Sequence, residues 1–483
     1  QQAAAAKSRE YDRIIFDTRK AERIAQVREH LGVGEDQISF VEHHRAHLAA
    51  AYYTAPGLTP GEPVLGLTCD GAGDGLCATV SICTGNGIDR ISSTSRHASV
   101  GKIYSRITYL LGMTPWEHEY KLMGMAPYAD PVRAERAAEK LRPLLRIGDD
   151  DMSFELGTEL STNYCYEYLR DAYERVRFDT VAGAVQLYTE EMLLEWVQKT
   201  VRKTGIGKLV CGGGVFMNVK ANMLLAALPE VESYHVMPSA SDESLSIGAC
   251  LDRYYQTSGE IDHGSSVLPN LYLGADYDRA AEARAIRDNL GGDPITVHES
   301  NDVDGEIVSL LANGEIVARC RGRMEWGARS LGNRSLLAPA DDSRVIDRLN
   351  ASIKQRDFWM PFAPSIRAES ASRYYDDPKK LNPRFMTLAF ESKAATRADL
   401  AAGAHPRDHT IRPQLVEADA VPDYHRVLTG FEERTGRGVI LNTSFNLHGE
   451  PIVCTPEDAI STFRRSGLPH LALNGHLLSK QVA

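Results

Sequence analysis

The chain has 483 residues, of which 43% are hydrophobic and 25% charged, and this excludes a mainly disordered, collagen-like or coiled-coil protein. The 54 basic and 65 acidic residues leave a formal net charge of −11, which argues against a protein that holds nucleic acid by bulk charge. A local basic pocket for a small anion is still compatible with that charge. No apolar run reaches the roughly 18 residues of a membrane-spanning helix, so we expect no membrane span, and the length predicts about two or three modules.

The eight cysteines include no CxxC pair, and most of them lie among apolar neighbours. This pattern predicts buried free thiols in a reducing, cytoplasmic setting. No signal peptide is visible, and the chain begins with Gln rather than Met. A segment that precedes residue 1 in the natural protein is therefore an open alternative.

The first half of the sequence predicts strands and helices in alternation. Residues 1–30 read as a loop followed by a helix, and residues 38–41 as a short strand that leads into His43. A helix over 46–54 and a turn-rich loop over 56–63 precede a buried strand over 64–69 that ends at Asp70. Further on, we expect a hairpin of 78–84 and 89–95, an amphipathic helix over 183–204, strands over 208–211 and near 234–237, and a helix to about 256.

This alternation is typical of an α/β protein. Residues 257–275 are rich in Gly, Pro and Ser and are the candidate linker between two domains, which we expect at 1–262 and 263–483. The second domain opens with predicted helices over 278–289 and 303–313 and a strand over 315–320.

Three histidines and two distant aspartates form the first chemical pattern. His43 and His47 are four residues apart, so on a helix they lie one above the other, about 6 Å along the axis, and can share one metal ion. Asp70 and Asp242 each follow a predicted strand, and α/β sheets bind ligands beyond the carboxyl ends of their strands. Two His and two Asp make a mixed N/O donor set for a divalent metal, whereas an isolated HxxxH is more often a solvated or capping pair.

Two glycine turns follow predicted strands, at 70–75 and 212–218. Glycine lets the backbone approach a phosphate, and the helix that follows favours an anion at its N-terminus. Each turn alone is weak evidence, because a tight structural turn has the same sequence. Two in one α/β half suggest an actin-like or sugar-kinase-like ATP fold. Lys121, in the string 121–128, is by itself more readily explained as a solvated lysine.

The second half contains a local excess of arginine in a glycine-rich stretch. Five arginines fall between 319 and 334, and Lys354 and Arg356 follow. Guanidinium forks suit phosphate and carboxylate oxygens, although a salt-bridged surface is the alternative. The polar string 441–446 has no matching charge and reads as a ligand-facing loop.

These motifs together resemble the NodU/CmcH family of O-carbamoyltransferases, and the resemblance covers almost the whole chain. It rests on the histidine string at 43–47, on Lys121-x-Met123-Gly124-x-Ala126-Pro127, on Gly213-Gly214-x3-Asn218, on Asp70 and Asp242, on Glu325-x-Gly327-x-Arg329-x-Leu331-Gly332-x-Arg334-Ser335, on Lys354 and on Asn442-Thr443-Ser444-Phe445-Asn446. The chain departs from the family at its start, because the glycine strand and the Glu-Glu-Arg segment with which members begin are not in this sequence. If that strand were absent from the protein, its activity would be in doubt.

The resemblance implies a TsaD-like first domain of the actin/sugar-kinase (ASKHA) superfamily. This domain would hold iron or another divalent metal through four ligands, His43, His47, Asp70 and Asp242. The nucleotide, ATP with Mg²⁺, would be placed by Gly71, Lys121, Gly213, Gly214 and Asn218. The second domain would be YrdC-like and would bind carbamoyl phosphate through Arg329, Arg334, Lys354, Arg412, Asn442 and Ser444.

The implied activity is ATP-dependent O-carbamoylation in two steps. Carbamoyl phosphate and ATP would give carbamoyl-adenylate, with Arg329, Arg334 and Lys354 as the catalytic cations. The carbamoyl group would then pass to a hydroxyl of a small-molecule natural product, with His44 as a possible base or, equally, a structural residue. Threonylcarbamoyl-type transfer to tRNA and a non-enzymatic nucleotide-binding regulator are the alternatives. Five aromatic residues are candidates for lining an acceptor cleft, although they suit a core or surface as well: Trp116, Tyr120, Tyr164, Tyr166 and Tyr168.

Overall fold

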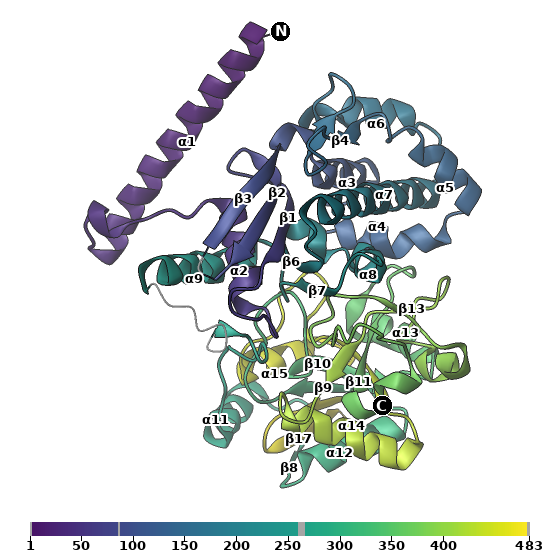
Figure 1. Cartoon of the computed structure of the whole chain (residues 1–483). Coiled ribbons are helices and arrows are strands. Elements are labelled where there is room, and N and C mark those ends of the chain that lie inside the picture. The colour runs from purple at the N-terminus through teal and green to yellow at the C-terminus, as the bar shows by residue number, and fades with distance from the viewer. Residues whose placement is uncertain (1, 86, 259–265, 481–483) are drawn as a thin grey trace. The chain divides into compact units, whose positions relative to one another are not determined.

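The computed structural model describes residues 2–85, 87–258 and 266–480 (Figure 1). The chain divides into a short unit, residues 1–42, and a large unit, residues 43–483. The short unit consists of helix α1 (Gln2–Leu31) and a 3₁₀ turn (Glu35–Gln37). Residues 38–41 were predicted as a strand, and this is wrong: they pair with no described strand. Helix α1 also runs from residue 2 without the expected initial loop, in keeping with the high helix propensity of the alanine run at 3–6.

Within the large unit, residues 43–258, here called the first half, are built on a five-stranded sheet of order β3-β2-β1-β6-β7. β1 pairs antiparallel with β2 and parallel with β6, and β6 pairs parallel with β7. The predicted hairpin is confirmed as β2 and β3, although residue 86 in its turn lies outside the described residues. The strands are β1 (Val64–Gly73), β2 (Leu76–Thr84), β3 (Gly87–Ser95), β6 (Lys208–Gly212) and β7 (Ser233–Val236), with a separate pair, β4 (Leu145–Ile147) and β5 (Phe154–Leu156).

Helices account for most of the rest of the first half. The predicted helix over 183–204 begins earlier, at Phe178, and its 27 residues make it the longest helix of the described large unit. It ends at Thr204, and the next residue, Gly205, adopts the left-handed conformation (φ of +69°) that often terminates a helix. The helices are α2 (His43–Thr54), α3 (Val100–Leu110), α4 (Glu119–Met125), α5 (Pro131–Ala138), α6 (Tyr166–Ala172), α7 (Phe178–Thr204), α8 (Val219–Ala227) and α9 (Leu245–Ser258).

Residues 266–480, here called the second half, are built on an eight-stranded mixed sheet of order β14-β11-β15-β10-β9-β16-β17-β8. Its strands are β8 (Ile295–Glu299), β9 (Val317–Cys320), β10 (Arg334–Pro339), β11 (Ala363–Arg367), β14 (Gln414–Val416), β15 (Val439–Ser444), β16 (His470–Ala472) and β17 (His476–Lys480), and β12 (Phe390–Glu391) pairs with β13 (Thr410–Ile411). Its helices are α11 (Arg279–Asn289), α12 (Val303–Ala312), α13 (Arg344–Leu349), α14 (Pro422–Thr435) and α15 (Pro456–Arg465).

The two halves share one core. A single cluster of buried apolar side chains runs from Leu48 in α2 to Leu478 in β17. Such continuity fixes side chains of both halves in one frame. Part of the expected linker over 257–275, namely residues 259–265, lies outside the described residues. The mixed α/β class predicted from the sequence is confirmed.

All eight cysteines are free, and six of them are buried, as expected. Among the described residues, no helix combines the length and apolar character that a membrane crossing requires.

Candidate active site

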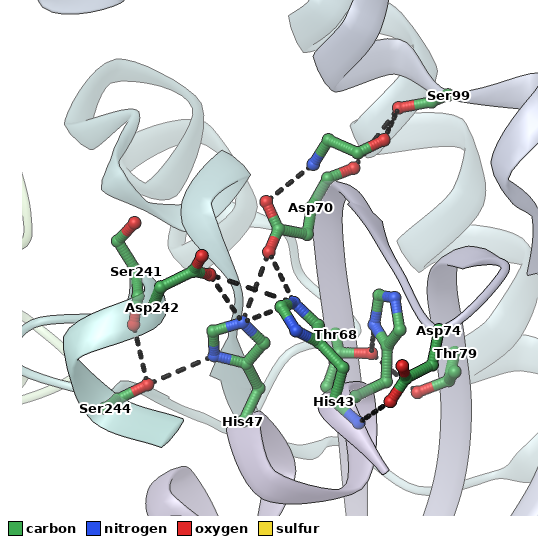
Figure 2. Close-up of polar contacts among 12 residues, drawn as sticks. His43, His47, Thr68, Asp70, Asp74, Thr79, Ser99, Ser241, Asp242 and Ser244 are labelled. Carbon is green, nitrogen blue, oxygen red and sulfur yellow. Dashed lines mark hydrogen bonds and ion pairs between the residues drawn. The ribbon is translucent and has the colours of Figure 1, made fainter. Parts of the chain in front are cut away.

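Four side chains converge beside the end of β1. His43 and His47 lie one turn apart on α2, Asp70 lies on β1, and Asp242 opens the short turn before α9. Nε2 of His43 is 3.0 Å from Oδ2 of Asp70 and 3.1 Å from Nε2 of His47, and Oδ1 of Asp242 is 3.5 Å from the latter nitrogen. One ligand atom of each residue lies within 4.8 Å of the other three (Figure 2). The structure therefore brings together the four residues that the sequence singled out.

A hydroxyl behind the cluster fixes the tautomer of His47. Ser244 donates its only hydroxyl proton to the carbonyl oxygen of Ser241 at 2.8 Å, so it accepts the proton on Nδ1 of His47 at 3.1 Å (Figure 2). With the proton on Nδ1, the lone pair of Nε2 points toward Asp70 and His43. This is the state in which an imidazole binds a metal.

The electrostatics of the cluster favour a cation at its centre. Burial disfavours the charge on Asp70, but its contacts with His43 and His47 outweigh this and hold the pKa of the carboxyl well below its usual range. Two imidazole nitrogens and two carboxylate oxygens, all acceptors, face one another, and a divalent metal satisfies all four at once. The donor set thus fits iron or a similar divalent ion. The side chain of Asp242 is 69% exposed, which leaves one side of the cluster open to a substrate.

His44 lies outside this convergence. Its ring is fully buried, and Nδ1 pairs with the hydroxyl of Thr68 at 2.8 Å, which in turn pairs with Thr79 at 2.6 Å. These contacts tie α2 to β1 and β2. A buried ring held in this way cannot reach a substrate hydroxyl, so the suggestion of His44 as a base is corrected to a structural role.

The two glycine turns pack against the cluster of His43, His47, Asp70 and Asp242, here called the four-residue cluster. Gly213 has a φ of +99°, and a Cβ there would lie 2.4 Å from the carbonyl oxygen of Cys69, so no other residue fits. A Cβ on Gly214 would lie 3.1 Å from Oδ1 of Asp70, and the amide of Gly71 donates to the same oxygen at 2.6 Å. Gly71 and Gly214 therefore lie directly beside Asp70.

Asn218 has a different role from the one expected. Its side-chain oxygen caps α8 by accepting from the amide of Ala221 at 3.1 Å, and its amide group donates to Gln186 at 3.0 Å. The side chain thereby joins α8 to α7. It does not line the cavity between the two halves, so the structure gives it a capping role rather than contact with a ligand there.

A cavity of about 440 Å³ lies where α4 and the start of α8 face the second half. Both halves contribute to its wall, and His118, Tyr120 and Lys220 reach it from the first half. Five residues to which the sequence assigned a nucleotide or carbamoyl phosphate line it: Lys121, Arg329, Lys354, Arg412 and Ser444. Arg356, which follows the arginine-rich stretch and had no role predicted from the sequence, lines the cavity too.

Four cations of the second half line this cavity without a counter-ion. No carboxylate of the described residues forms an ion pair with Arg329, Lys354, Arg356 or Arg412, and Nε of Arg412 is buried with no hydrogen-bond partner. Burial lowers the pKa of all four groups. The neighbouring guanidinium of Arg356 further lowers the pKa of Lys354, and that of Arg329 adds to the lowering at Arg356, whose pKa is about 10. An anion in the cavity would relieve this strain.

The backbone around Lys354 has an unusual conformation, and both Lys354 and Arg356, on either side of Gln355, line the cavity. Lys354 ends a π-helical turn, Asn350–Lys354, and the next residue, Gln355, has a φ of +46°. Such turns cluster at functional sites. Nζ of Lys354 donates to Oγ of Ser444 at 3.0 Å and to Oδ1 of Asn446 at 2.7 Å, so the polar string 441–446 orients the ammonium group.

Two other predicted ligands of carbamoyl phosphate prove to be structural. Arg334 is 1% exposed, and its guanidinium donates to backbone carbonyl oxygens, among them those of Cys454 at 3.0 Å and Gly322 at 3.0 Å. The amide of Asn442 is buried against Gln414 at 2.9 Å. Neither residue lines the cavity, because their polar atoms already pair with the protein itself.

A buried carboxylate holds the loop that carries Arg329. Oε1 of Glu325 accepts the backbone amides of Leu331 at 2.7 Å, Asn333 at 2.7 Å and Arg334 at 3.1 Å. The loop is thereby wrapped around one oxygen, which positions Arg329. Glu325 belongs to the quoted motif, but its spacing gives no sign that it binds the backbone.

Both lysines that the first half contributes are neutralised by the second half. Lys121 pairs with Asp357 at 3.1 Å, and Lys220 pairs with Asp408. Lys220 gave no signal in the sequence, because its position in the cavity depends on how the halves pack. Of the five aromatic candidates for an acceptor cleft, Tyr120 lines the cavity; the others do not.

Comparison with known proteins identifies the family. The family models described as Carbamoyltransferase N-terminus and Carbamoyltransferase C-terminus match residues 3–251 and 308–480. Nodulation protein NolO of Bradyrhizobium diazoefficiens is 30% identical over 447 residues, 92% of this chain and 79% of its own length. The 3'-hydroxymethylcephem-O-carbamoyltransferase of Streptomyces clavuligerus is 30% identical over 57% of this chain and 50% of its own. The crystal structure of full-length HypF in its phosphate- and nucleotide-bound form aligns with 35% of this chain and 21% of its own, at 18% identity and a TM-score of 0.24. The chain belongs to the carbamoyltransferase family and is an enzyme that transfers carbamoyl groups.

Proposed function

We propose that the protein is an ATP-dependent O-carbamoyltransferase that forms carbamoyl-adenylate in the cavity and transfers its carbamoyl group at the four-residue cluster. The observation that carries this proposal is the set of four cations, Arg329, Lys354, Arg356 and Arg412, which line one cavity and form no ion pair with a carboxylate in the part of the chain that the structure describes. Such a site suits polyanionic substrates, and carbamoyl phosphate and ATP with Mg²⁺ are both polyanions.

We assign the two steps to the two expected domains, 1–262 as TsaD-like and 263–483 as YrdC-like. The strand order β3-β2-β1-β6-β7, with three antiparallel strands followed by parallel ones, supports an actin/sugar-kinase topology for the first. The location of the unpaired cations in the second half supports adenylate formation there.

In the first step, water cleaves the P–O bond of carbamoyl phosphate and releases phosphate and carbamate. A carbamate oxygen then attacks the α-phosphorus of ATP, and pyrophosphate leaves with the electron pair of the broken P–O bond. Lys354, held by Ser444 and Asn446, and the guanidinium groups of Arg329 and Arg412 offset the charge on the phosphoryl oxygens.

In the second step, the acceptor hydroxyl attacks the carbonyl carbon of carbamoyl-adenylate. The bond from that carbon to the phosphate oxygen breaks, AMP leaves with its electron pair, and the hydroxyl proton passes to solvent. His43, His47, Asp70 and Asp242 would hold the divalent metal, which when bound supplies Lewis acidity. The open side of the cluster at Asp242 suits a hydroxyl-bearing small molecule as the acceptor.

The test is release of pyrophosphate by the full chain given ATP, Mg²⁺ and carbamoyl phosphate, with no acceptor. We expect release that depends on carbamoyl phosphate and falls at least tenfold in Arg412→Met. A matched control is Arg397→Met, which removes an exposed cation that does not line the cavity. Pyrophosphate release that does not depend on carbamoyl phosphate, or that is unchanged in Arg412→Met, would refute the assignment of adenylate formation to this cavity.

A further inference from the structure

A lysine beside the four-residue cluster has no part in the chemistry described so far. Lys102 lies on α3, and its Cε and Nζ are each 3.8 Å from the position that a Cβ on Gly71 would occupy. Gly71 directly follows the cluster residue Asp70 and is one of the two glycines that flank it. The ammonium group thus passes over the end of β1 where the cluster forms.

Lys102 is held there by the start of its helix. The hydroxyl of Ser99, the N-cap of α3, donates to the carbonyl oxygen of Gly71 at 2.8 Å and accepts the backbone amide of Lys102 at 3.1 Å. One side chain therefore joins the strand end to the first turn of the helix. The position of Lys102 relative to Asp70 is set by the fold rather than by a flexible loop.

Asp70 does not serve as the partner of this lysine. Its Oδ2 faces His43 and His47, its Oδ1 accepts the amide of Gly71, and among the described residues no carboxylate forms an ion pair with Lys102. Burial and the nearby guanidinium of Arg106 lower the pKa of Lys102. The remaining contact is with the ring of Trp116, whose centroid is 5.4 Å from Nζ.

The space next to Lys102 is open. Trp116 is 82% exposed and adopts a φ of +69°, an uncommon conformation for a bulky residue. A half-buried ammonium group without a carboxylate, beside an exposed aromatic ring, suits a phosphorylated ligand that reaches the cluster from solvent.

We propose that Lys102 binds the phosphate group of the adenylate at the transfer site and so positions it against the cluster. This proposal rests on the proposed function. When the acceptor oxygen attacks, the bond from the carbonyl carbon to the phosphate oxygen breaks, and the electron pair of that bond stays on AMP. The phosphate gains one negative charge in that step, and the fixed ammonium group of Lys102 offsets it.

AMP is the probe for the test, and Trp116 supplies the signal because its ring lies beside Lys102. AMP, adenosine and inorganic phosphate are each titrated into the full chain while tryptophan fluorescence is recorded. Trp116→Phe identifies the part of the response that comes from this site, which separates it from AMP bound in the cavity. Lys102→Met removes the charge, Lys102→Arg keeps it, and Lys203→Met, on the exposed end of α7, is the control.

We expect the Trp116 response to AMP to need at least tenfold more AMP in Lys102→Met, and to change less than about threefold in Lys102→Arg and Lys203→Met. The Trp116 response to adenosine, which lacks the phosphate, should be the same in the wild type and in the three lysine variants. An unchanged AMP response in Lys102→Met, or an equal loss for AMP and adenosine, would overturn the proposal, as would a wild-type chain without any Trp116 response. Pyrophosphate release by the wild type is measured in parallel, so that failure of the proposed function is seen separately.

Discussion

Substituting Arg356 by Met should stabilise the fold while it impairs catalysis. Burial and the nearby charge of Arg329 lower the pKa of Arg356 from 12.5 to about 10, which corresponds to a cost of roughly 3 kcal/mol for keeping the charge. A hydrogen bond to Thr443 at 3.1 Å and the ring of Phe362 at 4.8 Å each return about 1 kcal/mol. The net expectation is a gain in the free energy of unfolding of about 1 kcal/mol.

The sign of the pH dependence follows from the lowered pKa of Arg356. At pH 7 the group is charged in both folded and unfolded chains, so the full cost is present, and it declines only as the pH rises through about 10. The variant should therefore raise the apparent Tm by about 1–3 °C at pH 7 and by less near pH 11. Pyrophosphate release should fall between about 10-fold and 150-fold, because a charge-assisted contact with substrate is lost.

Thermal unfolding by circular dichroism, with and without inorganic phosphate, checks this prediction. Phosphate should raise the Tm of the wild type more than that of Arg356→Met, since the variant has one cation fewer to neutralise. A Tm that falls by several degrees in the variant, together with intact pyrophosphate release, would show that the cations serve the fold. The reasoning from unpaired charge to substrate binding would then be refuted.

Three further predictions concern the four-residue cluster, the backbone at Gly213 and the ammonium group of Lys354. Asp70→Asn should lose bound metal by elemental analysis, whereas Asp74→Asn, which only accepts a backbone amide at 2.9 Å, should retain it; equal metal content would contradict the ligand set. Gly213→Ala should lower the free energy of unfolding by roughly 2–4 kcal/mol, because a Cβ there collides with a carbonyl oxygen of β1, while Gly205→Ala, with open space around it, should cost only about 1 kcal/mol; similar losses in the two would show that strain alone decides. Burial lowers the pKa of Lys354 well below 10.5, so pyrophosphate release should decline at a lower pH than it would with an ordinary lysine. Lys354→Arg should shift this decline to higher pH. Identical pH profiles for the wild type and the variant would show that Lys354 does not cause the decline.

The elements that the sequence predicted well are those with a local physical cause. The strand that ends at Asp70 and the hairpin after it follow from apolar runs bounded by glycine, and β1, β2 and β3 have these bounds to within a few residues. The strand predicted over 38–41 is wrong, because an apolar run becomes a strand only when it pairs with another strand, and these residues pair with no described strand. Pairing is a property of the whole fold, which a local pattern does not contain.

The candidate site shows the same division. The spacing of His43 and His47 predicts that they share a helix face, and strand ends predict where Asp70 lies, so the cluster could be assembled from the sequence. Arg329 and Arg334, in contrast, look alike in sequence. Arg334 is bound by backbone carbonyl oxygens and Arg329 faces the cavity, and carbonyl oxygens leave no trace in a pattern of side chains.

The distribution of charge in the cavity suggests which half binds the anion. Lys121 and Lys220, the two lysines that the first half contributes to the cavity wall, each pair with an aspartate of the second half, so they bring no net charge to the cavity. The four cavity cations that form no ion pair with any carboxylate of the described residues all belong to the second half. The second half therefore supplies the positive charge of the cavity, and the first half supplies part of its wall. This division agrees with adenylate formation in the second half and transfer at the first-half cluster, whose donor atoms suit a cation rather than an anion.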